Sequence, residues 1–314
     1  MLRITKNSKI FLAGHNGMVG SAIFRKLKLK GYKKILLKNK NKLNLLDQKK
    51  TQNYLKRTKP DLVIIAAARV GGINANLNFK DKFLYENLQI QNNLIHGSYL
   101  AGVKNLFFLG SSCIYPSKCK QPMKEKYLLT GPFESTNEGY AIAKVSGIKM
   151  CEYYNKNKNL NYKSFIPPNM YGPNDNYDLN TSHFFPALLR KIYQCKKKKK
   201  KILKIWGTGK PKREVMYVED FAESLIYFFN ISIKEPFINI GTGREYSINF
   251  FANFLMKKFN IKLKIQYEKS KPDGMKNKCL DINLAKKYLW KPPKNGLNKS
   301  FVDLLKDFEK RIKL

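Results

Sequence analysis

The chain has 314 residues, of which 43% are hydrophobic and 13% aromatic, so it can bury a large core and is not a disordered chain. It contains no apolar run approaching the ~20 residues that a membrane-spanning helix needs. Lys and Arg outnumber Asp and Glu by 61 to 22, and the five cysteines are scattered in no paired spacing, which excludes a disulfide framework.

Short apolar runs alternate with longer amphipathic segments over the first half of the chain. Strands are predicted at residues 10–13, 35–37, 62–66, 106–109 and 164–166. Helices are predicted at residues 18–30, 48–57, 80–100 and 138–154. This alternation predicts an α/β fold with a doubly wound, parallel Rossmann sheet.

The alternation becomes less regular after residue 170. Helices are predicted at residues 182–193, 218–229, 247–259 and 298–310, and strands at residues 202–206 and 237–240. We therefore expect a cofactor-binding domain over residues 1–170 and a smaller, mixed α/β substrate lobe over residues 171–314. The strand at 237–240 is one that could return to the first sheet.

A glycine pattern directly follows the first predicted strand and opens the first helix. Gly14, Gly17 and Gly20 form a GxxGxxG motif, which allows a tight turn and close approach of the backbone to a pyrophosphate at the helix N-terminus. Without that context, the pattern would indicate only a tight turn. Lysines rather than an acid follow the second predicted strand, so Lys38 favours NADPH over NADH.

A tyrosine and a lysine four residues apart form the candidate catalytic pair. Tyr140 and Lys144 share one face of a helix, and a nearby ammonium is expected to lower the tyrosine pKa. Ser111 follows the fourth predicted strand, at the sheet edge where ligands of such folds bind, although a serine there could also be a turn hydroxyl. Together with the glycine motif, these residues predict a Ser-Tyr-Lys oxidoreductase.

The net charge of +39 could indicate a nucleic-acid partner, but the cations are spread along the chain. The dense lysine run at 196–201 lacks interleaved aromatic residues and is interpreted as a solvated loop. A general positive field favours an anionic substrate or cofactor. Scattered cysteines are typical of a reducing compartment, so we expect a cytoplasmic protein without a nucleic-acid or membrane partner. No metal-binding spacing is present.

Longer sequence blocks resemble a known group of enzymes. They are GHNGMVGS at 14–21, LGSSCIYP at 109–116, TNEGYAIAK at 136–144, NMYGP at 169–173, WGTG at 206–209 and SKPDG at 270–274. In this order and spacing, the chain resembles the extended short-chain dehydrogenase/reductase superfamily and, within it, the GDP-L-fucose synthases. The resemblance covers nearly the whole chain.

This resemblance implies a two-step reaction on GDP-4-keto-6-deoxy-D-mannose, with epimerisation at C3 and C5 followed by NADPH-dependent reduction at C4 to give GDP-L-fucose. It implies that Cys113 is the base and His183 the acid of the epimerisation. Taken alone, either side chain would more often be structural. In the reduction, the resemblance makes Tyr140 the proton donor, while Lys144 tunes Tyr140 and Ser111 orients the C4 oxygen.

The same resemblance assigns the binding residues. The cofactor-binding set is Gly14, His15, Asn16, Gly17, Met18, Val19, Gly20, Lys38, Leu109, Gly110, Ser111, Ser112, Lys144, Pro167, Pro168, Asn169, Met170 and His183. The substrate-binding set is Lys191, Trp206, Arg213 and Asp273.

Relatives of this kind are homodimers, so the resemblance implies a homodimer in which the helices predicted at 80–100 and 138–154 pair with those of a second copy. Two other hypotheses remain open. One is another nucleotide-sugar 4-reductase or 4-epimerase of the same superfamily, which would need no Cys113/His183 pair. The other is a non-catalytic NADP-sensing or nucleic-acid-binding protein.

Overall fold

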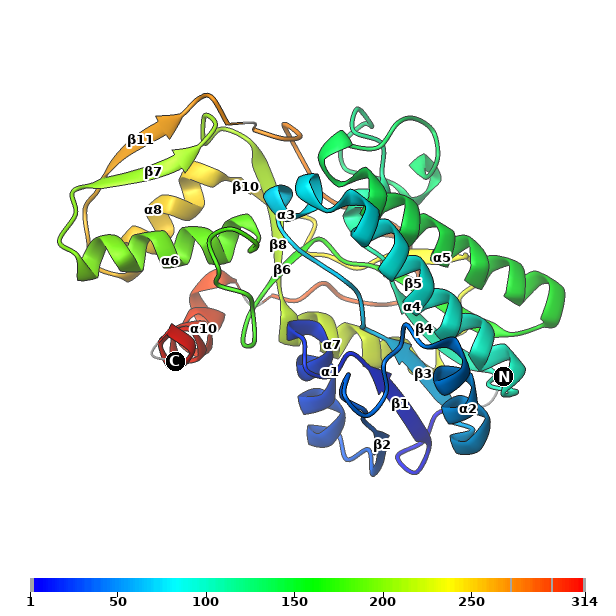
Figure 1. Cartoon of the computed structure of the whole chain (residues 1–314). Coiled ribbons are helices and arrows are strands. Elements are labelled where there is room, and N and C mark those ends of the chain that lie inside the picture. Colours follow the sequence, from blue (N-terminus) through cyan, green and yellow to red (C-terminus); the bar gives the residue numbers. More distant parts are fainter. Residues whose placement is uncertain (1–2, 272, 295, 313–314) are drawn as a thin grey trace.

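A six-stranded, wholly parallel sheet forms the centre of the larger half of the molecule (Figure 1). The structure is a computed structural model and describes residues 3–271, 273–294 and 296–312. The strands are β1 (Lys9–Ala13), β2 (Lys34–Leu36), β3 (Leu62–Ile65), β4 (Asn105–Leu109), β5 (Asn161–Ile166) and β9 (Phe237–Asn239). Their spatial order is β2-β1-β3-β4-β5-β9, which confirms the predicted doubly wound Rossmann sheet.

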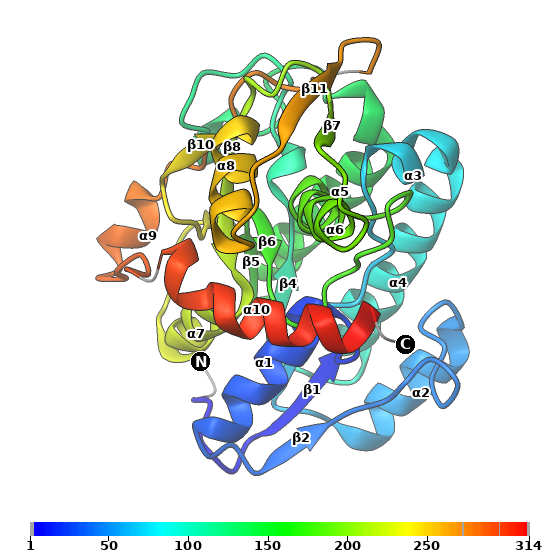
Figure 2. The ribbon, with the colours of Figure 1, turned by 90° about the vertical axis from the view of Figure 1, so that its left-hand side faces the viewer.

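Helices cover both faces of this sheet, as Figures 1 and 2 show. On one face α1 (Met18–Leu29) packs against α7 (Val218–Tyr227). On the other, α4 (Lys80–Leu100) lies between α2 (Gln48–Thr58) and α5 (Glu138–Lys158). Because both faces are covered, the four residues of β3 are all fully buried and all apolar, which is why this strand reads as a continuous apolar run.

Among the described residues, the smaller half contains two short sheets and three α-helices. The strands are β6 (Asn169–Tyr171), β7 (Ile202–Trp206), β8 (Lys212–Tyr217), β10 (Glu245–Ser247) and β11 (Lys264–Glu268). The helices are α6 (Phe184–Lys197), α8 (Ile248–Lys258) and α10 (Leu297–Ile312). Two short α-helices elsewhere in the described residues are α3 (Ile73–Asn78) and α9 (Asn283–Lys287). β7 pairs in parallel with β11, and β8 lies between β6 and β10. Buried and exposed residues alternate along β7, as expected for a strand covered on one face.

The described residues form two hydrophobic cores, and the chain alternates between them. The first core surrounds the six-stranded sheet and includes residues of α7, β9 and α9 in addition to those of the first half. The second core lies among α6, α8, α10 and β7. Strand β9 pairs with β5 at the edge of the large sheet, so the chain returns to the first core long after residue 170. Among the described helices, none combines the length and apolar character needed to span a membrane.

Asp175, in the turn after β6, is a buried carboxyl group with an incomplete set of hydrogen bonds. It is 7% exposed, and its Oδ1 accepts the Asn176 N–H at 2.7 Å. Its Oδ2 is buried without a hydrogen-bond partner among the described residues. Burial raises its pKa from 3.8 to about 7, with the Asn176 N–H opposing the rise and the charge of Asp307 adding to it.

The Asp175→Asn variant should therefore change the pH dependence of stability. The native chain holds a proton on Asp175 between about pH 4 and 7 that the unfolded chain releases, so this group's contribution to stability is lost as pH rises through that range. At pH 8 the variant should be more stable by on the order of 2–4 kcal/mol, and near pH 4 the difference should vanish. Thermal unfolding followed by circular dichroism at both pH values measures this. Glu309→Gln, which removes an exposed carboxylate on α10, is the matched control, and an equal gain in both variants would contradict the assignment.

Candidate active site

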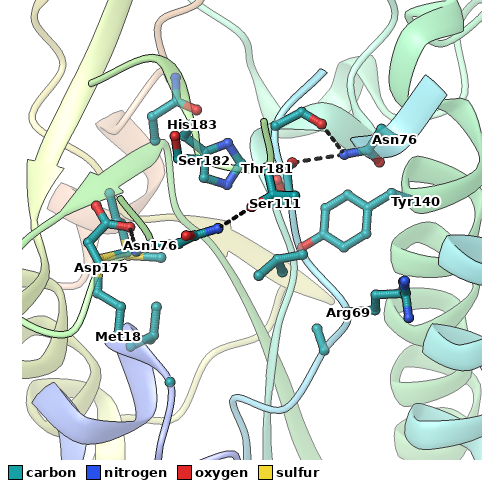
Figure 3. A pocket seen from close by; sticks show the side chains of 18 of the residues that line it. Met18, Arg69, Asn76, Ser111, Tyr140, Asp175, Asn176, Thr181, Ser182 and His183 are labelled. Atoms are coloured by element: carbon teal, nitrogen blue, oxygen red, sulfur yellow. Dashed lines mark hydrogen bonds between the residues drawn. The ribbon is translucent and has the colours of Figure 1, made fainter. Parts of the chain in front are cut away.

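One large cavity, of about 980 Å³, extends from the carboxyl end of the parallel sheet to the smaller half of the molecule. This volume is at the upper end of the range for small-molecule sites. Figure 3 shows side chains from both halves of the molecule around the cavity, with Ser111, Tyr140 and His183 facing the same space. Its position agrees with the rule that open α/β sheets bind ligands beyond the carboxyl ends of their strands.

The glycine turn after β1 forms one wall of the cavity. Gly14 has φ +88°, and a Cβ there would lie 2.5 Å from the backbone nitrogen of Ala67, so this position requires glycine. A Cβ on Gly20 would lie 2.1 Å from the Gly14 carbonyl oxygen. No side chain caps α1 at Gly17, which leaves the N–H groups of its first turn available to an anionic ligand. These features fit the pyrophosphate of a dinucleotide.

Cations line the part of the cavity next to β2. Lys38 and Lys40 both line it, and the Lys38 ammonium lies 5.8 Å from the centre of the Tyr54 ring. No acid follows β2 until Asp47, so nothing between the strand and that residue would repel a 2′-phosphate.

Ser111 and Cys113 lie where β4 ends. The Cys113 N–H donates a hydrogen bond to the Ser111 hydroxyl at 3.4 Å, within a single helical turn over Ser112–Ile114. Both residues line the cavity, although Cys113 is only 6% exposed. Burial raises the pKa of the Cys113 thiol, while the charges of Lys278 and Lys144 and the Ser111 hydroxyl act in the opposite direction.

Tyr140 and Lys144 lie on α5, but only the tyrosine reaches the cavity lining. The Lys144 ammonium lies 5.6 Å from the centre of the Tyr140 ring and donates a hydrogen bond to the Leu109 carbonyl at 2.8 Å. Burial lowers the pKa of Lys144 to about 8. Burial also raises the pKa of Tyr140, and the charge of Cys113 adds to the rise, which is the opposite of the direction predicted from the sequence.

His183 lines the side of the cavity opposite Tyr140, as Figure 3 shows, and immediately precedes α6. Desolvation within the cavity lowers its pKa, and the charge of Lys278 lowers it further. Cys113 and His183 therefore line one cavity and both experience the charge of Lys278. The charge of Lys278 offsets part of the rise in the thiol pKa that burial causes, and it adds to the lowering of the imidazole pKa.

The four predicted substrate-binding residues all line the cavity. The Lys191 ammonium lies 5.8 Å from the centre of the ring of Trp206, a residue that is 40% exposed. The Arg213 guanidinium donates to the carbonyls of Met275 at 2.6 Å and Asp273 at 3.1 Å, which fixes its position.

The carboxylate of Asp273 has a structural role. It accepts hydrogen bonds from the Thr208 N–H at 2.7 Å and the Thr208 hydroxyl at 2.8 Å. It thereby ties the 273–275 loop to the turn after β7, so its carboxylate is already engaged before any ligand binds.

Most of the predicted cofactor-binding residues also line the cavity. They are Gly14, His15, Asn16, Gly17, Met18, Val19, Lys38, Gly110, Ser111, Pro167, Pro168, Asn169, Met170 and His183. Four do not: Gly20, Leu109, Ser112 and Lys144. Gly20 lies behind Gly14, and Lys144 is buried behind Tyr140 against the Leu109 carbonyl. Ser112 is 4% exposed, and its N–H donates to the Pro167 carbonyl.

Sequence reasoning missed several residues of the lining. Lys278 is one, together with Glu134, Asn137 and the loop from Arg69 to Gly72. Lys278 follows the SKPDG block by four residues, a signal that 61 cations in the chain obscure. The Glu134 carboxylate interacts with both Arg213 and Lys278. The cavity therefore contains an arginine and a lysine that both experience the charge of Glu134, and the charges of Glu245 and Asp273 act on Arg213 as well.

Comparison with known proteins places this arrangement in a family. Residues 10–241 match the model of the NAD dependent epimerase/dehydratase family. The chain belongs to that family. It is 44% identical over 296 residues to a GDP-L-fucose synthase of Sinorhizobium fredii, covering 93% of this chain and 94% of the relative.

Two solved structures are also similar to this chain. A GDP-L-fucose synthetase from Naegleria fowleri bound to NADP superposes with a TM-score of 0.90 at 25% identity, covering 99% and 97% of the two chains. A GDP-mannoheptose C4 reductase from Campylobacter jejuni with NADP bound has a TM-score of 0.86 at 32% identity, covering 98% and 99%.

Proposed function

We propose that this chain converts GDP-4-keto-6-deoxy-D-mannose to GDP-L-fucose with NADPH as reductant. The observation that carries the proposal is that Cys113, His183 and Tyr140 line one cavity, together with a glycine turn that fits a dinucleotide. A 3,5-epimerisation needs one group to remove a proton and another to return it, whereas a ketone reduction needs a single proton donor. Similarity to GDP-L-fucose synthases supports the substrate.

In the epimerisation, Cys113 acts as the base and His183 as the acid. Protons next to a ketone are acidic enough for an enzyme base once the enolate oxygen is stabilised. Burial raises the pKa of the Cys113 thiol, and the charge of Lys278 opposes that rise and so favours the thiolate. Desolvation lowers the pKa of His183, so its imidazolium is the minor form near neutral pH; that form returns the proton and is restored from solvent.

In the reduction, Tyr140 donates a proton to the C4 oxygen, and the Ser111 hydroxyl orients that oxygen. A raised pKa keeps the Tyr140 phenol protonated, as a donor must be. NADPH, when bound, supplies the hydride. Gly14 and Gly17 would hold its pyrophosphate, and Lys38 its 2′-phosphate. Lys144, behind Tyr140, would orient the phenol.

The two parts of the chain have separate roles in this proposal. Residues 1–170, with the returning strand β9, hold the cofactor, and the greater part of residues 171–314 binds the GDP-sugar through Lys191, Trp206 and Arg213. Five free cysteines fit a reducing compartment, so the cytoplasm is the proposed location.

A homodimer is part of the proposal, with α4 and α5 as the interface. Large side chains on these helices are exposed, including Tyr85 at 65% and Tyr153 at 55%. Burying such side chains against a second copy would remove apolar surface from water. Light scattering on the purified chain tests this, and a monomer at micromolar concentration would contradict it.

The purified chain, incubated with GDP-4-keto-6-deoxy-D-mannose and NADPH, tests the whole proposal. NMR of the product sugar should show inverted C3 and C5 and a reduced C4. A product reduced at C4 but not inverted would indicate a simple nucleotide-sugar 4-reductase. Binding of NADPH with no conversion of the sugar would favour a dinucleotide-sensing protein.

Arg213→Met should weaken substrate binding more than catalysis. Arg213 lines the cavity, and a guanidinium is suited to bind a pyrophosphate with paired hydrogen bonds. Loss of such a contact costs roughly 1.5–3 kcal/mol, so KM for the GDP-sugar should rise about 10- to 100-fold with a smaller change in kcat. Steady-state kinetics measure this, with the exposed Arg244→Met as matched control. An unchanged KM in Arg213→Met would remove this residue from the binding site.

A further inference from the structure

Two segments from different halves of the molecule meet beside the cavity. Their contact involves none of the sequence blocks named above. One runs from Gly71 into α3, and the other is the loop 178–183 that ends at His183. The Gly72 N–H donates a hydrogen bond to the Thr181 carbonyl at 2.8 Å. We call this contact between residues 71–76 and 178–183 the clasp.

The clasp depends on a close approach at Gly72. A Cβ there would lie 2.2 Å from the Ser182 carbonyl oxygen, nearer than atoms can pack. The backbone of Gly72 is extended, with φ −70° and ψ −178°, a conformation that any residue adopts. Space, rather than conformational freedom, therefore requires glycine at this position.

Asn76 fixes the glycine side of the clasp. It is 5% exposed, and its side-chain amide donates to the Gly71 carbonyl at 2.8 Å and the Gly72 carbonyl at 3.0 Å, as the dashed lines in Figure 3 show. A buried amide that bonds two successive carbonyls holds the loop in one conformation.

The other side of the clasp is a turn with its own hydrogen bonds. The Asp178 carboxylate accepts from the N–H groups of Asn180 and Thr181, each at 3.0 Å, and the Ser182 N–H donates to the Asp178 carbonyl at 2.9 Å. Because the turn is internally bonded, a shift of the Thr181 carbonyl moves the whole turn. His183 follows directly and is the residue from which α6 starts.

We propose that Gly72 and Asn76 are positioning residues, which hold the 178–183 turn so that the His183 imidazole faces the reacting carbons. This rests on the proposed role of His183 as the acid of the epimerisation. The reduction uses Tyr140 and Ser111, which lie on α5 and after β4, outside the clasp. Disturbing the clasp should therefore slow the return of a proton to C3 and C5 by His183 more than it slows the donation of a proton to the C4 oxygen by Tyr140.

The test uses Asn76→Ala and Gly72→Ala, with Asn78→Ala as matched control on the exposed side of α3. Deuterium entry from heavy water into C3 and C5, measured without NADPH, should fall about a hundredfold in both clasp variants, as expected for an acid misplaced by ~1 Å. Exchange in the control variant should not change. If exchange persists at the wild-type rate in both clasp variants, the proposal is overturned.

A second readout does not depend on the reaction. The chain has only three histidines, so the His183 imidazole signals can be assigned by NMR with the His183→Asn variant. These signals should shift in Asn76→Ala and Gly72→Ala, but not in Asn78→Ala. Unshifted His183 signals would overturn the clasp even if exchange fell. If the wild-type chain shows no exchange at all, the proposed function fails, and the imidazole spectra still decide whether the clasp positions His183.

Discussion

Replacing Tyr140 with phenylalanine should abolish NADPH oxidation while leaving proton exchange at C3 and C5 intact. The phenol faces the cavity, and burial raises its pKa, so it is a protonated donor throughout the neutral range. Loss of a general acid lowers the rate of its step about 10²- to 10⁴-fold. Absorbance at the NADPH band in single-turnover experiments measures the reduction, and NMR in heavy water measures the exchange.

Tyr153→Phe is the matched control for this experiment. Tyr153 lies on the same helix as Tyr140 but is 55% exposed and does not line the cavity. Its hydroxyl should be dispensable for both half-reactions. If Tyr140→Phe retained wild-type NADPH oxidation, another group would have to protonate the C4 oxygen, and the proposed mechanism of reduction would be wrong.

Cys113→Ser should have the complementary effect on exchange. A serine hydroxyl is a far weaker base than a thiolate, so deuterium entry into C3 and C5 should fall at least about a thousandfold, while NADPH binding should remain. Cys119→Ser is the matched control, because Cys119 is a free, half-buried cysteine outside the cavity. Exchange at the wild-type rate in Cys113→Ser would exclude this thiol as the base.

The pH dependence of Cys113 alkylation in the ligand-free chain, measured as the difference from Cys113→Ser, gives a second readout. Burial raises the pKa of Cys113, so the thiolate fraction, and with it the alkylation rate, should increase with pH above neutrality. Lys278 opposes that rise. Its replacement by methionine should therefore move the ascending limb of the profile to higher pH. A limb that stayed in place would show that Lys278 does not influence the thiol.

The parts of the fold that the sequence predicted best are those determined by local pattern. Strand β3 is an uninterrupted apolar run because both faces of the sheet are covered. The turn before α1 requires glycine at position 14, because a Cβ there would collide with the backbone of Ala67. Helix α4 has the predicted bounds, residues 80–100. In contrast, β8 was missed, because Lys212, Arg213 and Glu214 are charged residues that do not resemble a strand.

The residues of the candidate site that belong to sequence motifs were predicted. Contacts between segments that lie far apart in the sequence were not. Ser111, Cys113 and Tyr140 lie in recognisable blocks, and all three line the cavity. The contact of Gly72 with the 181–182 carbonyls joins residues more than a hundred positions apart, so no local pattern announces it. Similarly, the raised pKa of Tyr140 follows from burial, which the spacing to Lys144 does not specify.

The alternation of the chain between its two cores limits how such enzymes can be recombined. A chimera made by joining two relatives at one point near residue 170 would take α7, β9 and α9 from the wrong parent, and these elements pack in the first core. Exchanging the sugar-binding half alone requires moving several separated segments together. Those segments include α6 with β7, then α8, and finally α10, whose apolar side chains share one core. New sugar specificity is thus more accessible through changes at single cavity positions than through exchange of whole modules.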